Sequence, residues 1–178
     1  MAELTLTPVP PATGALPVTT GSMTLALATP GPLTSIAPFR GQTEAVSEAL
    51  KAATDLTLAP GYTASGGAAV QWFGRDLWLL SGIAAPDLPG AALTDQTDAW
   101  VTLDLTGPRI AGVMSRLVPL DLREGAFPEG RAVRTEMHGM MVALARTGPE
   151  SLRIMAFRSM AGTLAGTISE AMEHVAAL

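Results

Sequence analysis

The chain repeats one order of short elements, strand, helix and hairpin, and this order restricts it to a mixed α and β fold. Alternating apolar and polar residues predict strands, and apolar residues three and four positions apart predict helices. Strands are expected at 23–28, 33–39, 56–58, 69–73, 77–80, 100–105, 133–146 and 152–157. Helices are expected at 42–53, from Ile110 to Leu117, and at 160–175. Residues 82–98, rich in Ala, Pro, Gly and Asp, are expected to form a connecting loop.

The two halves, about 22–82 and 99–178, have the pattern of related βαββ-like units packed as a single α+β domain with a C-terminal helix. Three pairs of residues keep one common offset: Gly41 and Gly107, Leu56 and Leu122, and Trp72 and His138. The agreement is one of pattern and not of identity. Two unrelated hairpins at similar spacing are therefore the alternative interpretation.

Residues 1–21 carry four prolines among Thr, Ala and Gly, which indicates an extended arm with little structure of its own. The arm is either disordered or laid over a neighbouring subunit. This stretch lacks the basic start and apolar run of a signal peptide. The chain has no run of about eighteen apolar residues, so no membrane span is expected.

Composition narrows the class of partner. The net charge is −5 with 11 basic residues that do not cluster, which argues against nucleic acid as a partner. Apolar residues make up 48% of the chain and charged residues only 15%, so part of the surface is expected to be covered by another protein. All but one of the basic residues are Arg, which suits planar ion pairs, although codon usage in a GC-rich genome explains the bias equally well.

The residues that usually perform catalysis are missing or isolated. Cys is absent, which excludes thiol catalysis and thiolate metal sites and fits a cytoplasmic location. The two histidines, His138 and His174, stand apart in the sequence, and neither a phosphate-binding loop nor a nucleophile elbow is present. We therefore expect no catalytic, cofactor-binding or metal-binding residue in this chain.

The strongest local signal is ionic. Five charged residues stand beside apolar neighbours and not among other charges: Arg116, Asp121, Arg123, Arg134 and Arg158. Arginines in such surroundings pair internally or bind the carboxylates of a partner with two hydrogen bonds. For Arg116 and Asp121 an internal bridge is the favoured interpretation.

Several short words of the sequence, in this order and spacing, resemble a known family. They are the run from Ser115 to Leu122, Phe127-Pro128, Arg134-Thr135, and Phe157-Arg158-Ser159 before the last helix. The chain is similar over most of residues 22–178 to the gamma subunit of heterotetrameric sarcosine oxidase. That resemblance implies a fold related to the folate-binding glycine-cleavage T-protein (aminomethyltransferase). This chain is too short to build the folate cavity of a full T-protein.

The resemblance also implies a setting. The family belongs to a flavoenzyme that converts sarcosine, oxygen and tetrahydrofolate to glycine, hydrogen peroxide and methylene-tetrahydrofolate. Alpha, beta and delta subunits would be the partners, and they would hold FAD, FMN, NAD, folate and zinc. The resemblance transfers no catalytic residue to this chain, so its own part in the enzyme stays open. Two interpretations compete, a noncatalytic subunit that supports assembly and an independent T-protein-like protein that binds a small molecule such as folate.

Overall fold

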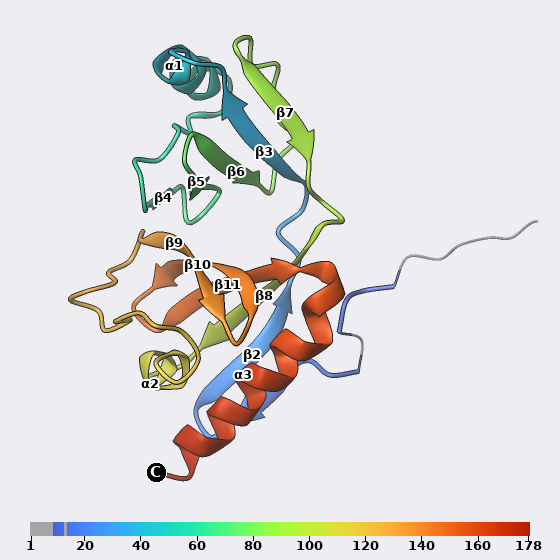
Figure 1. Ribbon diagram of the computed structural model, residues 1–178, viewed down its shortest axis with the longest axis vertical. Helices are drawn as coiled ribbons and strands as arrows, with labels where there is room; N and C mark the ends of the chain where they lie inside the picture. Colours follow the sequence, from blue (N-terminus) through green and yellow to red (C-terminus); the bar gives the residue numbers. More distant parts are fainter. Residues whose placement is uncertain (1–8, 13) are drawn as a thin grey trace, which may run out of the picture.

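The computed structural model describes residues 9–12 and 14–178 and consists of two stacked antiparallel sheets, each covered by a helix on its outer face (Figure 1). The larger sheet has the order β1 (Val18–Thr20), β2 (Met23–Ala28), β8 (Trp100–Thr106), β11 (Ser151–Phe157), β10 (Met140–Gly148) and β9 (Ala132–Met137). The smaller sheet has the order β4 (Ala64–Ser65), β5 (Val70–Gly74), β6 (Leu77–Ser81), β3 (Leu33–Pro38) and β7 (Ala91–Asp95). The helices are α1 (Thr43–Thr54), α2 (Ile110–Met114) and α3 (Ala161–Ala176), and the short 3-10 helix η1 (Arg158–Met160) precedes α3. The predicted α+β class with a C-terminal helix is confirmed.

Helix α3 lies across the larger sheet and closes the main core (Figure 1). Its residues Leu164, Ile168, Met172 and Val175 are all buried, as the 3.6-residue period predicted. They pack over β8, whose Val101, Leu103 and Leu105 form the predicted apolar face. In the smaller sheet, α1 buries Val46 and Leu50 over Ile36 and Leu80, whereas Ala45 is exposed.

Strand β8 differs from the half-buried strand that its alternation predicted. Its second face is also covered, because the smaller sheet packs against it, and Trp100 and Thr102 are both buried there. Trp100 does cover a neighbouring element, Phe73 of β5, with the two ring centroids 4.9 Å apart. Six buried residues join the two sheets: Leu33, Phe73, Leu79, Trp100, Ala143 and Met155.

The two sheets share a strand order, β4-β5-β6-β3 in one and β9-β10-β11-β8 in the other. The equivalent hairpins close at Gly74–Leu77 and at Gly148–Ser151, and each has a register shift just before its glycine. By this equivalence the position of Trp72 in the first half corresponds to that of Arg146 in the second. The prediction that Trp72 and His138 occupy equivalent positions is therefore wrong. The constant offset fails here because β9 and β10 are longer than β4 and β5.

The single strand predicted at 133–146 is wrong, because the chain reverses at His138–Gly139 between β9 and β10. Both turn residues have positive φ, 46° and 83°, and Met137 pairs with Met140 across them. This is the geometry of a two-residue hairpin turn, which usually carries Asn-Gly or Asp-Gly. The turn was not predicted because His-Gly is not one of the usual sequence signals for a two-residue hairpin turn.

Three further expectations need correction. Residues 82–98 are not all loop, because β7 pairs with β3 at the edge of the smaller sheet. Its side chains are mostly exposed, so the strand depends on backbone pairing and leaves no apolar alternation to recognise. Residues 56–58 form no strand. Helix α2 is shorter than predicted, although Ile110, Val113, Met114 and Leu117 are buried on one face as expected.

The described part of the predicted N-terminal arm packs against the larger sheet of its own chain, and part of it is a strand. Val18–Thr20 forms β1 and pairs with β2, and Ala12 and Leu16 pack against the core under α3. Residues 1–8 and 13 of that arm lie outside the described residues. In the part of the chain that the structure describes, no helix is long and apolar enough to cross a membrane.

Candidate functional site

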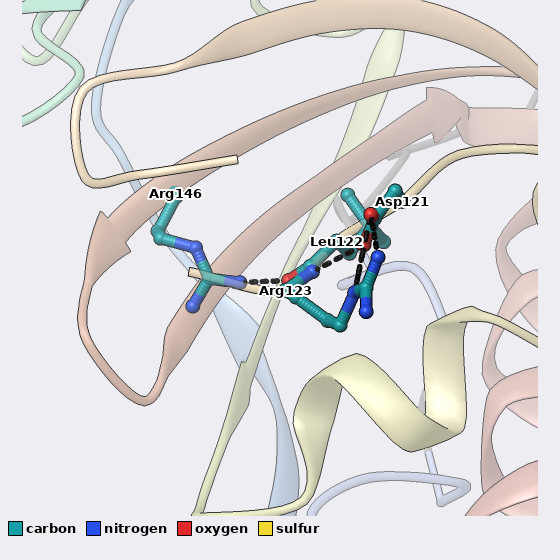
Figure 2. Close-up of polar contacts among 4 residues, drawn as sticks. All are labelled: Asp121, Leu122, Arg123 and Arg146. Atoms are coloured by element: carbon teal, nitrogen blue, oxygen red, sulfur yellow. Dashed lines mark hydrogen bonds and ion pairs between the residues drawn. The ribbon is translucent and has the colours of Figure 1, made fainter. Parts of the chain in front are cut away.

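The segment that follows α2 is a loop whose charged side chains, Arg116, Asp121 and Arg123, are exposed. Asp121 does not pair with Arg116 as predicted but with Arg123, whose Nε and Nη2 donate to the carboxylate at 2.9 and 2.5 Å (Figure 2). These hydrogen bonds and that of the Arg123 backbone N–H lower the pKa of Asp121 to about 2. Both side chains are exposed, 83% for Arg123 and 42% for Asp121. Arg116 is exposed, and within the described ranges it makes no ion pair.

A buried arginine from another element holds this loop in place. Arg146 of β10 is 3% exposed, and its guanidinium donates to the carbonyl of Leu122 at 2.5 Å (Figure 2). It also donates to the carbonyls of Phe127 at 2.5 Å and Pro149 at 2.7 Å. Burial lowers the pKa of Arg146 from its usual range. The sequence analysis missed this residue. The available signal was its place at the end of the apolar run Met140–Ala145.

A second missed pair lies on the sheet surface. Arg153 of β11 faces Asp104 of β8, with Nε–Oδ1 and Nη2–Oδ2 distances of 3.0 and 3.2 Å. The ion pair is bidentate, and its two side chains are about three-quarters buried. Its two residues are opposite one another in the ladder, which sequence alone could not reveal without the strand register.

Arg134 lies at the seam between the sheets, where its guanidinium carbon is 4.8 Å from the centroid of Phe73 and 5.7 Å from that of Trp100. Nη1 donates weakly to the Phe73 carbonyl at 3.4 Å. Nε is buried and has no hydrogen-bond partner among the described residues. Trp100 in turn stacks on Phe157, with centroids 4.7 Å apart. The arrangement is a column of aromatic rings ending in a cation.

Arg158 lies at the start of η1, where its Nη2 donates to the Val9 carbonyl at 2.7 Å. Its nearest described carboxylate is that of Asp98, at 4.0 Å and almost fully exposed. Beside it is a hollow of about 500 Å³ between the N-terminal segment, the end of β2 and the two links that join the sheets. Its lining is mainly apolar and includes Pro10, Leu27 and Trp100.

The two histidines, far apart in sequence, line one hollow of about 220 Å³ together with Arg116 and Glu170. They do not form a metal site, because no group of three or more His, Cys, Asp or Glu side chains in the described ranges is placed to hold an ion. Zinc therefore does not fit these residues.

The strand pairing bears on nucleotide cofactors. All pairings between the strands described above are antiparallel. The usual dinucleotide site needs parallel strands with a glycine-rich turn leading into a helix. The residues described here thus do not fit that kind of FAD or NAD site.

Comparison with known proteins gives the fold a context. No family model matches the chain. Over 100 residues it is 35% identical to the sarcosine oxidase gamma subunit of Corynebacterium sp. (strain U-96), an alignment that covers 50% of this chain. It spans about half, 48%, of that curated relative.

A solved structure matches nearly the whole chain. It is a chain of the heterotetrameric sarcosine oxidase from Corynebacterium sp. U-96, in complex with pyrrole 2-carboxylate. The TM-score is 0.74 with 26% sequence identity, and the match covers 92% of this chain and 90% of that chain.

Together, the two sheets with their covering helices define an α+β protein with the fold of a subunit of a multi-chain oxidase. Within that class, the sequence match is to the gamma subunit of sarcosine oxidase. The resemblance on which the sequence analysis relied is confirmed.

Proposed function

We propose that this protein is the gamma-type subunit of a heterotetrameric sarcosine oxidase and supports its assembly without contributing catalytic residues. The observation that carries the proposal is the structural match, which extends over 92% of the chain and 90% of its counterpart in such an oxidase.

The partners we propose are the alpha, beta and delta subunits, and we assign FAD, FMN, NAD, folate and zinc to them. The assembly would oxidise sarcosine to glycine with release of hydrogen peroxide and transfer of the one-carbon unit to tetrahydrofolate. We place it in the cytoplasm, because a chain without cysteine needs no oxidising compartment to fold.

The test is co-expression of this chain, tagged, with the alpha, beta and delta genes from the same source. We expect the four chains to co-elute in a fixed ratio and the complex to produce peroxide from sarcosine. The purified chain alone is expected to be colourless and inactive. Failure to co-elute, together with tight folate binding by the isolated chain, would instead support the independent folate-binding protein.

A further inference from the structure

The surface around the aromatic column carries an apolar and cationic patch, which we define as Arg134, Met141, Phe157, Arg158 and Met160. Met141, Phe157 and Met160 are three of the large apolar side chains that the described surface exposes, at 45%, 48% and 37%. They stand at one end of the larger sheet, beside the seam with the smaller sheet.

The strand register brings Arg134, Met141 and Phe157 to one face, and Arg158, which follows Phe157, lines the same hollow as Trp100. Ala143 pairs with Met155 in this antiparallel ladder, so Met141, two residues before Ala143, and Phe157, two residues after Met155, point to the same face at the same end of β10 and β11. Phe157 pairs with Trp100 on its other side and stacks on that ring. Arg134 pairs with Ala143 and lies over the rings of Phe73 and Trp100.

The residue types are those that concentrate energy in protein interfaces. Aromatic residues, Met and Arg are enriched at the centre of such interfaces. Here the half-exposed ring of Phe157 stacks on the buried ring of Trp100, with the two centroids 4.7 Å apart. A rigid anchor loses little side-chain entropy on binding.

The charges indicate what kind of partner fits. The chain as a whole is acidic, with a net charge of −5, whereas this patch contains two arginines, the more exposed Arg158 and the partly buried Arg134. No described carboxylate pairs with Arg134, and Arg158 has only the distant contact to Asp98. The nearby carboxylate of Glu136, opposite Met141, is engaged by the Gly139 backbone N–H. Such a surface favours a partner that brings its own carboxylate.

We propose that this patch is the docking surface for a segment of a partner subunit that presents apolar side chains next to a carboxylate. The proposal rests on the proposed function, since it assigns the surface through which the chain joins the oxidase. The carboxylate would pair with Arg158 at the rim, and the apolar side chains would cover Met141 and Phe157.

The experiment measures the affinity of the full chain for the co-expressed alpha, beta and delta subunits. Phe157→Ser and Met141→Ser are each expected to weaken binding about tenfold or more, as the loss of interface anchors does. Phe39→Ser is the matched control, because Phe39 is also exposed, at 57%, but directly follows β3 of the smaller sheet. It should bind within about twofold of wild type.

Charge variants test the carboxylate. Arg158→Glu should weaken binding more than Arg158→Lys, and the weakening should shrink at high salt. Arg75→Glu, on the exposed β5–β6 turn, is the control and should bind like wild type. Melting of each free variant shows whether it folds, and Met141→Ser, the change least involved in packing, decides the matter if Phe157→Ser does not.

Different results separate the two proposals. If the wild-type chain does not co-elute with the subunits, the proposed function fails and this inference fails with it. If wild type co-elutes but the folded Phe157→Ser and Met141→Ser variants bind equally well, only the docking surface is wrong. If wild type alone forms a dimer that Phe157→Ser dissociates, the patch binds a second copy of this chain, and the assignment to a partner subunit is overturned.

Discussion

At the scale of single residues, three arginines show how surroundings decide what one residue type does. Arg123 is exposed and pairs with its near neighbour Asp121. Arg134 is held over two aromatic rings. Arg146 is buried and joins three backbone carbonyls from two loops. Only the last has the geometry of a structural anchor, because its removal leaves buried acceptors without donors.

We expect Arg146→Ala to lower the free energy of unfolding by at least about 3 kcal/mol, since two of its three hydrogen bonds go to buried carbonyls and bonds from a charged donor each contribute about 1.5–3 kcal/mol. Chemical denaturation at neutral pH measures the change. Arg123→Ala is the control and should change stability by less than about 0.5 kcal/mol, as exposed positions do. Equal effects of the two substitutions would show that Arg146 does not anchor the loop.

The Asp121–Arg123 pair predicts a definite titration. The folded pKa, about 2, is below the ordinary value of about 3.9, so the stabilisation is present above about pH 4 and is lost as pH falls through 2. An NMR titration of the Asp121 carboxyl should give the low pKa in wild type and in Arg116→Ala. In Arg123→Ala the pKa should return toward 3.9. If the pKa of Asp121 rises in Arg116→Ala instead, Asp121 pairs with Arg116, as the sequence predicted, and the assignment to Arg123 is wrong.

At the scale of elements, two glycines mark places where the backbone permits no other residue without cost. Gly139 has a φ of 83° in the β9–β10 turn and open space around it. Gly107, where β8 leaves the sheet, has a φ of 127° and lies against the β1–β2 turn. A Cβ there would be 2.5 Å from the Ser22 carbonyl oxygen. Gly139 is needed for its positive φ, whereas Gly107 is needed both for its positive φ and because a Cβ would clash with the neighbouring backbone.

Gly139→Ala should therefore destabilise the protein by about 1 kcal/mol, through backbone strain alone. Gly107→Ala should cost clearly more, because the clash is with backbone atoms that cannot turn aside. Gly125→Ala, in open space without positive φ, should be nearly neutral. Melting of the three variants ranks them. The account of the β8 exit fails if Gly107→Ala melts no lower than Gly139→Ala.

At the scale of the whole molecule, the two sheets share buried side chains and are expected to unfold together. Leu79 of the smaller sheet is fully buried in the cluster that includes Met155 of the larger one. Backbone hydrogen bonds also cross between the sheets, from Ala64 N–H to the Gly130 carbonyl and from Ala132 N–H to that of Tyr62. Contacts of this kind couple the stabilities of the parts they join.

Leu79→Ala should lower the free energy of unfolding by about 2–5 kcal/mol and raise hydrogen exchange in both sheets. Leu50→Ala, buried only in the core under α1, is the matched control. It should raise subglobal exchange in the smaller sheet more than in the larger one. If Leu79→Ala affects the smaller sheet alone, the sheets open independently.

The sequence by itself determined the elements whose signal is local. The apolar period of α3, the alternation in β8 and the Gly74–Leu77 hairpin were all predictable, because each depends on residues within a few positions of one another. The order of these elements was enough for the α+β class. The family resemblance was predicted from short sequence motifs, and the overall sequence and structural matches agree with it.

Tertiary structure alone decided the rest, because it depends on which distant segments meet. Strand β7 forms because it pairs with β3. Trp100 is buried because the smaller sheet, built from a different part of the chain, packs against β8. Asp121 had two arginines within reach in sequence, and only the turn of the loop selected Arg123. The position of Arg146 and the patch at Phe157 likewise depend on the register between neighbouring strands. The sequence of one strand alone does not specify that register.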